Sequence, residues 1–194
     1  MEQAIEIHPL PPFAPEGAKM LMLGSFPPPR TRWKMDFFYP NFQNDMWRIF
    51  GIVFFKDKHY FLTEDQKSFH EAKIRRFLTE KKIALWDTAM EVNRQKGNAS
   101  DKYLEVLRPI DLEQILSQLP DCRTIVATGQ KALDILLMLT GANEPKVGSS
   151  TETVFCSRHL RIYRMPSSSR AYPKPLDEKA VVYKNMFEEI GITT

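Results

Sequence analysis

The amino-acid sequence predicts an α/β fold, a three-layer sandwich with a central, mainly parallel sheet between helices. Short apolar runs alternate with stretches of helical periodicity, which is the order expected of parallel strands joined by helices. The run at residues 19–23 is mostly apolar without alternation, as in a strand covered on both faces. Hydrophobic residues make up 43% and charged residues 26% of the 194 residues, a balance that supports a domain with a substantial core.

The first strand is expected near residues 19–24. Gly24 would free the backbone to turn there, and the three prolines at 27–29 cannot continue a hydrogen-bonded ladder. Residues 1–18 are rich in proline and are expected to form an extended arm outside the core, with residues 19–194 forming a single domain. Further strands are predicted at 83–86, ending in Asp87, and at 124–127, 153–156 and 160–164.

Helix signals lie between these strands. A helix is expected to start at Asp45, with Asn44 as its N-cap. The amphipathic stretch at 63–81 opens with Thr63 and Gln66, which resemble a capping box. Three further helices are predicted at 111–119, 129–139 and 177–190, and a polar loop is predicted at 91–102.

Charge and cysteine content exclude several classes of protein. A net charge of +3 and a pI of about 8.8 indicate only a mild preference for polyanions, so the placement of Arg and Lys matters more. Cys122 and Cys156 cannot by themselves form a four-thiolate zinc site or an iron–sulfur site. The first ten residues lack the apolar run of a signal peptide, and no stretch of about 18 apolar residues occurs. We expect a reduced, cytoplasmic protein with no membrane association, and no obligate protein partner is indicated.

The loops that follow the predicted strands should meet at one edge of the sheet, where open α/β sheets bind ligands. That edge would collect residues 25–29, Asp87, Thr128 with Gly129, and residues 166–172. The proline-rich loop could equally be a rigid connector. No Gly-rich dinucleotide loop, phosphate-binding loop or nucleophile elbow is present, and the four histidines do not stand at metal-ligand spacing. We therefore expect no metal and no cofactor.

Two polar segments stand out as candidate binding elements. The aromatic run at 37–42 lies beside Asn41 and Asn44, and rings next to amides can stack on a base and hydrogen-bond to its edge. Alternatively, the rings belong to the core and Asn44 only caps a helix. The loop at 166–170 carries three serines and Arg170, groups that suit phosphate oxygens, or it is simply a solvated loop.

Four motifs in this order resemble the uracil-DNA glycosylase superfamily, and most closely its hypoxanthine-DNA glycosylase branch. They are the Gly-Ser-Phe-Pro opening at 24–27, the aromatic run followed by Asn-Asp-Met-Trp at 44–47, the strand at 83–87 and the Pro-Ser-Ser-Ser loop at 166–169. The resemblance spans residues 19–175 and implies the fold predicted above.

The resemblance also implies an activity, the hydrolysis of the N-glycosidic bond of a deaminated base, uracil or hypoxanthine, that is flipped out of DNA. The sugar gains oxocarbenium character and the base leaves as an anion, so the protein must hold the base and place a water. No metal or redox cofactor is implied, and DNA is the expected partner. The candidate catalytic residues are Asn44 and Asp87. The candidate base-binding residues are Ser25, Phe26, Phe38 and Tyr39, and the candidate DNA-binding residues are Arg30, Arg32, Arg48, Ser167, Ser168, Ser169 and Arg170.

Two positions depart from the uracil-cleaving branches. Their water-activating Asp or Asn is replaced by Phe26, which the hypoxanthine-type branch shares, and the His or Asn that opens their late loop is replaced by Met165. Two alternatives therefore stay open. One is a non-catalytic, nucleic-acid-binding relative of the same fold, and the other is an enzyme that acts on an unrelated small nucleotide.

Overall fold

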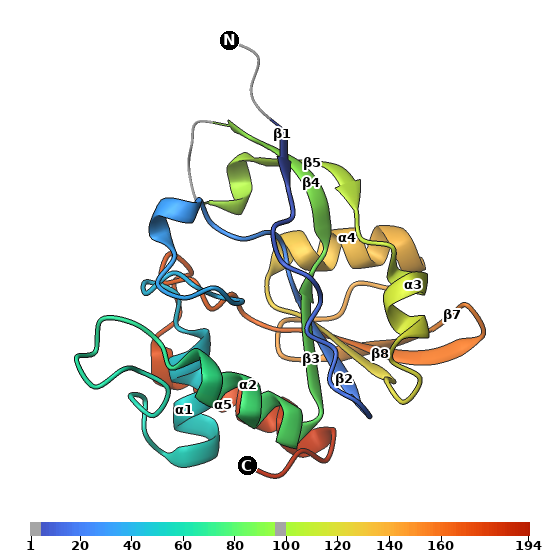
Figure 1. Cartoon of the computed structure of the whole chain (residues 1–194). Coiled ribbons are helices and arrows are strands. Elements are labelled where there is room, and N and C mark those ends of the chain that lie inside the picture. Colours follow the sequence, from blue (N-terminus) through green and yellow to red (C-terminus); the bar gives the residue numbers. More distant parts are fainter. Residues whose placement is uncertain (1–4, 96–99) are drawn as a thin grey trace.

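The computed structural model describes residues 5–95 and 100–194, and within them it contains two β-sheets and five α-helices (Figure 1). The larger sheet has the strand order β3-β2-β6-β8-β7. Its first four members run parallel, whereas β7 pairs antiparallel with β8, so the sheet is mixed. The bounds are β2 Met20–Gly24, β3 Ile83–Asp87, β6 Thr124–Ala127, β7 Ser150–Phe155 and β8 Arg158–Arg164.

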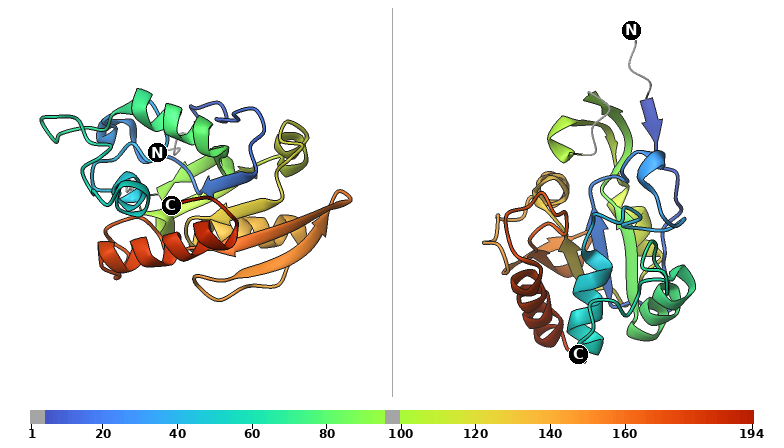
Figure 2. Two further views of the ribbon diagram at one scale, coloured as in Figure 1. Left: turned by 90° about the horizontal axis from the view of Figure 1, so that it is seen from below. Right: turned by 90° about the vertical axis from the view of Figure 1, so that its left-hand side faces the viewer.

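Helices cover both faces of this sheet because its central strands alternate their side chains between two cores. Met20 and Met22 of β2 join one apolar cluster with α1 (Met46–Phe55), α2 (Glu71–Lys81) and α5 (Leu176–Glu189). These three helices lie beside one another in the right-hand view of Figure 2. Leu21 and Leu23 of the same strand join the other cluster, with α3 (Leu112–Ser117) and α4 (Gln130–Thr140).

The smaller sheet is antiparallel and was not predicted from the sequence. Its order is β1-β4-β5, with bounds β1 Ile5–Ile7, β4 Ala89–Arg94 and β5 Leu104–Pro109. The expected loop at 91–102 is therefore wrong over residues 91–94, which belong to β4, and over the start of the short 3-10 helix at Asp101–Tyr103, and its residues 96–99 lie outside the described part of the chain. In β4, Ala89, Met90 and Val92 are buried in the core, whereas the polar residues Glu91, Asn93 and Arg94 are half-buried.

The described part of the N-terminal arm, residues 5–18, contains a strand. Its strand β1 pairs with β4, and Glu6 accepts two hydrogen bonds from Arg94, at 2.8 and 3.1 Å. Arg94 also donates to the carbonyl oxygen of Pro27, at 2.7 Å. The arm is thereby connected to the proline-rich loop that follows β2.

The helix predicted over 63–81 begins only at Glu71, so the prediction is wrong over residues 63–70. Gln66 has a φ of 54°, which an α-helix cannot contain, and the Thr63 hydroxyl donates to Asp65 rather than capping a helix. A bridge between Leu62 and Phe69 closes this segment into a compact turn.

The remaining predicted helices match α1, α3, α4 and α5 to within a few residues at each helix start. Asp111 caps α3 by accepting a hydrogen bond from the backbone N–H of Gln114 at 2.9 Å. Among the described residues, no helix is long and apolar enough to cross a membrane.

Candidate active-site cavity

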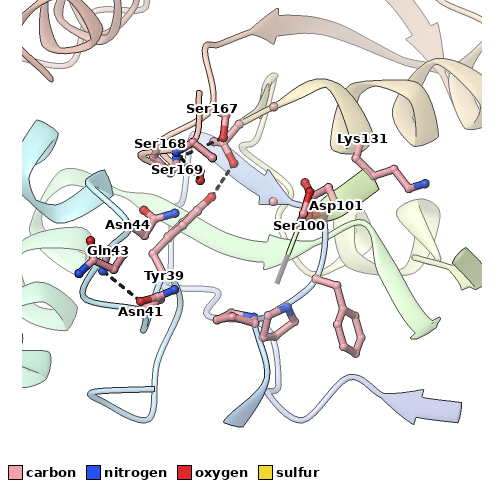
Figure 3. A pocket seen from close by; sticks show the side chains of 18 of the residues that line it. Tyr39, Asn41, Gln43, Asn44, Ser100, Asp101, Lys131, Ser167, Ser168 and Ser169 are labelled. Atoms are coloured by element: carbon pink, nitrogen blue, oxygen red, sulfur yellow. Dashed lines mark hydrogen bonds between the residues drawn. The ribbon is translucent and has the colours of Figure 1, made fainter. Parts of the chain in front are cut away.

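A cavity of about 590 Å³ opens at the carboxyl ends of the parallel strands. Its size falls within the range of roughly 300–1,000 Å³ that is typical of small-molecule sites. The loop after β2, the end of β3, the start of α4 and the serine loop at 167–170 all contribute to its lining. In Figure 3, Asn44 and the serines lie on one side of Tyr39, and Ser100, Asp101 and Lys131 lie on the other. The expectation that the loops at 24–29 and 166–170 face one cleft therefore agrees with the structure.

Gly24 forms part of the cavity floor for a steric reason. It is the last residue of β2, and a Cβ atom built there would lie 2.6 Å from Asp87 Oδ1 and 3.4 Å from the Tyr39 hydroxyl. Its φ is not in the left-handed region, so the expectation that glycine is needed here for a turn is wrong. Glycine is required because three polar side chains, with Thr128 as the third, converge on its Cα.

Tyr39 is fixed at this floor by its backbone and by its hydroxyl. The residue has a φ of 51°, and its hydroxyl lies 2.7 Å from Thr128 Oγ1. Burial, followed by the negative charge of Asp87, raises the pKa of Tyr39 well above its usual value. The hydroxyl therefore stays protonated. The ring also packs edge-on against Trp47, with centroids 5.9 Å apart, so Tyr39 forms a fixed wall of the cavity.

Asp87 ends β3 and makes a hydrogen-bonded pair with His8, from the N-terminal arm. The distance from His8 Nε2 to Asp87 Oδ2 is 2.8 Å, and the two side chains are only 3% and 9% exposed. The other ring nitrogen of His8 lies 2.9 Å from the carbonyl oxygen of Leu10. Sequence reasoning missed His8 because 79 positions separate it from Asp87, and only the pairing of β1 with β4 brings it to the site.

Asn44 has both a structural contact and a free group. Its Oδ1 accepts from the backbone N–H of Met46 at 2.9 Å, at the first turn of α1, although Asp45 is the formal N-cap residue. Its Nδ2 has no partner among the described residues, and Asn44 lines the cavity. A backbone bridge to Ser169 fixes its position against the serine loop. The two alternatives for Asn44, helix capping and ligand binding, therefore use opposite ends of one amide.

Two side chains of α5 hydrogen-bond to the backbone of the serine loop and of the proline before it. Lys179 donates to the carbonyl oxygen of Ser169 at 2.8 Å, and the Tyr183 hydroxyl donates to that of Pro166 at 2.9 Å. Burial lowers the pKa of Lys179. Ser167, Ser168 and Ser169 all line the cavity, and the Oγ atoms of Ser167 and Ser169 accept from backbone N–H groups two residues further on.

The four predicted DNA-binding arginines differ in their availability. Arg48 is 5% exposed and donates to the carbonyl oxygens of Phe42 and Asn44 and to Asp45, and burial lowers its pKa. It does not line the cavity, and its guanidinium, enclosed by these acceptors, is not placed to contact a phosphate as predicted. Arg30 also lies outside the cavity lining, paired with Asp36. Arg170 lines the cavity but binds Asp45 at 3.1 Å, whereas Arg32 lines it without an ion pair among the described residues.

The predicted base-binding residues all line the cavity. The Phe26 ring packs edge-on against His8, with centroids 5.4 Å apart, and Phe38 is only 3% exposed. The Ser25 hydroxyl donates to Asp101 Oδ1 at 2.7 Å. Asp101 and Lys131 also line the cavity but were not predicted as site residues. Asp101 lies in the segment predicted as a loop, and Lys131 lies at the start of the helix predicted over 129–139. Within the described residues, no cluster of His, Cys, Asp and Glu could hold a metal ion.

The chain was compared with family models, with curated proteins and with solved structures. No family model matches the sequence, and no curated protein matches it. The fold is similar to a solution NMR structure from Methanosarcina acetivorans that is described as a "putative Uracil DNA glycosylase". The TM-score is 0.59 at 23% sequence identity, and the match covers 94% of this chain and 99% of the other. The chain therefore shares, over nearly its whole length, the α/β fold of that protein.

Proposed function

We propose that this protein is a DNA glycosylase that excises a deaminated base, uracil or hypoxanthine, in base-excision repair in the cytoplasm. The observation that carries the proposal is the convergence of the Asn44 amide, the Asp87 carboxylate and the serine loop on one cavity. That cavity lies at the strand ends where ligands bind in open α/β sheets. The fold likeness to a protein described as a uracil DNA glycosylase supports the same class of reaction.

The reaction requires the protein to position the base and a water molecule and to stabilise the positive charge that develops on the sugar. A water oxygen bonds to the sugar C1′, the bond from C1′ to the base nitrogen breaks, and its electron pair leaves with the base. The proton lost by the water passes to solvent or to the departing base. Asp87, oriented by His8 at 2.8 Å, holds the water, and its negative charge stabilises the positive sugar.

Asn44 explains a preference for deaminated bases. Deamination replaces an exocyclic amino group, a hydrogen-bond donor, with a carbonyl oxygen, an acceptor. The Oδ1 of Asn44 is occupied by Met46 N–H, so the amide presents its Nδ2 donor and cannot flip without losing that bond. A donor in this position binds the new carbonyl and faces an unfavourable donor–donor contact with the original amino group.

A non-catalytic, nucleic-acid-binding role is the second candidate, and one observation favours it. Phe26 and Met165 stand where other branches of the resembled superfamily place polar residues, and neither side chain can orient water or stabilise a leaving base. Met165 is 1% exposed and lies in the core. On this reading the cavity would hold a flipped base without cleaving it.

A single-turnover assay separates the two candidates. The full chain is mixed in excess with short DNA strands and duplexes that carry one uracil, hypoxanthine or xanthine, and released free base is measured by chromatography. We expect release from at least one uracil or hypoxanthine substrate and none from undamaged DNA. Tight binding of these strands without base release would overturn the glycosylase proposal in favour of the binding role.

A further inference from the structure

We infer that a second cavity beside the first is the path of the nucleic-acid strand that carries the flipped nucleotide. It is called the basic groove here and is lined by Arg32, Lys34, Asn41, Phe42, Gln43, Gln66 and Lys67. Its volume is about 450 Å³. The inference rests on the proposed function, because it assigns the strand path for that same site.

The basic groove adjoins the active-site cavity. Arg32, Asn41 and Gln43 line both, so these three residues form a shared wall. A nucleotide whose base enters the first cavity has its sugar and phosphates near the mouth, and the neighbouring phosphates must follow the adjoining surface. The basic groove is a surface that begins at this shared wall.

The charge of the basic groove is positive and available. Arg32, Lys34 and Lys67 line it, and none of the described Asp or Glu residues does. Among the described residues, none of these three cations takes part in an ion pair, in contrast with Arg30, Arg48 and Arg170. A cation with no carboxylate partner can neutralise a phosphate without first giving up an existing interaction.

The walls of the basic groove are tied together by the chain itself. Lys34 N donates to the carbonyl oxygen of Pro40 at 2.9 Å, and the Ser68 hydroxyl donates to the carbonyl oxygen of Lys34. These bonds join the segment after the proline-rich loop to the turn that precedes α2. The Phe42 ring packs against the Arg48 guanidinium, 4.4 Å from its centroid, and against the Phe69 ring, with centroids 5.4 Å apart.

This arrangement suits one strand of nucleic acid. In proteins that bind single strands without reading sequence, a positively charged groove follows the backbone. Here Phe42 adds an apolar wall to such a groove. Arg48 therefore acts through Phe42, as a support of the groove, and not as a phosphate contact. Of the arginines predicted to bind DNA, only Arg32 is expected to bind backbone phosphate through this groove, and Lys34 and Lys67 join it.

The test compares two double variants that remove the same charge. Lys34→Gln/Lys67→Gln alters the groove. The control, Lys19→Gln/Lys82→Gln, alters two exposed lysines just before β2 and β3, at the ends of these strands that point away from the cavity. Affinity for a labelled, uracil-containing single strand is measured by fluorescence anisotropy over a range of salt concentrations. We expect the groove variant to lower the slope of log affinity against log salt by about 1.4, at about 0.7 per phosphate contact, and the control variant to leave it unchanged.

The outcomes separate this inference from the proposed function. Equal slopes for the two double variants, with normal base release by the wild-type protein, would overturn the groove and leave the glycosylase standing. A reduced slope for the groove variant, with no base release by the wild type, would support the groove and overturn the glycosylase. A wild-type protein whose affinity does not depend on salt would overturn both. Melting temperatures of all variants verify that each is folded.

Discussion

Two aspartates of this protein are equally buried and do different things. The side chains of Asp45 and Asp87 are each 9% exposed. Asp45 Oδ1 accepts from Arg48 at 3.2 Å and from Arg170 at 3.1 Å, so two guanidinium groups neutralise it. Asp87 has a single side-chain partner among the described residues, His8, and it lines the cavity.

The difference shows that burial alone does not identify a functional carboxylate. Removing a carboxylate from water is costly in both places, and at Asp45 two cations offset that cost. The backbone N–H of Asp45 also donates to the carbonyl oxygen of Ser168 at 2.9 Å, which ties the start of α1 to the serine loop. Asp45 therefore holds the site together, whereas Asp87 remains able to bind a ligand or a water. Four substitutions test this contrast, in order of their expected effect on the rate of base excision.

Asp87→Asn is expected to have the largest effect on the rate. The amide keeps the shape of the side chain but removes the negative charge that orients water and stabilises the sugar cation. Single-turnover excision should fall by about 100- to 10,000-fold, the range for a lost acid–base or charge-stabilising group. The melting temperature should change little, because His8 can still bond to the amide oxygen. Full activity in this variant would remove Asp87 from the mechanism.

Asn44→Ala should come next, with a loss of about 100- to 1,000-fold in rate, as for one positioned transition-state hydrogen bond. The same change removes the bond to Met46 N and should cost about 1 kcal/mol of folding free energy, as for a lost helix cap. Rate and melting temperature are measured on the same preparation. An unchanged rate with a lowered melting temperature would leave Asn44 as a cap alone and assign catalysis to Asp87.

His8→Gln should reduce the rate by about tenfold, which corresponds to about 1.4 kcal/mol in the activation free energy. Gln retains a donor for Asp87 but lacks the rigid ring that packs against Phe26. Because His8 acts through Asp87, its substitution should have little further effect in an Asp87→Asn background. Additive losses in the double variant would show that His8 has a separate role.

Asp45→Asn should have the smallest effect on the rate and a large effect on stability. It leaves Arg48 buried without its carboxylate, a change that typically costs about 3–5 kcal/mol. Unfolding by urea measures this loss, and excision is assayed at a temperature where the variant is still folded. A rate loss as large as that of Asp87→Asn in the folded variant would contradict the contrast between the two aspartates.

Much of the main sheet was determined by local sequence. The apolar runs at 83–86 and 124–127 predicted β3 and β6 to within a residue, because a strand buried on both faces needs apolar side chains at every position. The polar residues, glycines and prolines that follow the predicted strands indicated the loops that line the cavity, including the serine loop. Asp87 could be chosen as a candidate for the same reason, since it ends a predicted strand, whereas Asn44 was chosen from the family resemblance and from its place beside the aromatic run.

What only the tertiary structure decided depends on partners far apart in the chain. Strands β4 and β5 mix polar and apolar residues without a regular alternation, and only their pairing with each other and with β1 distinguishes them from loops. His8 reaches Asp87 across 79 positions, and Gly24 is explained by the approach of Asp87 rather than by its own backbone. Arg48 and Arg32 look alike in the sequence, but one is enclosed by acceptors and the other lines two cavities. Availability of a charge is a property of its surroundings, which local sequence does not contain.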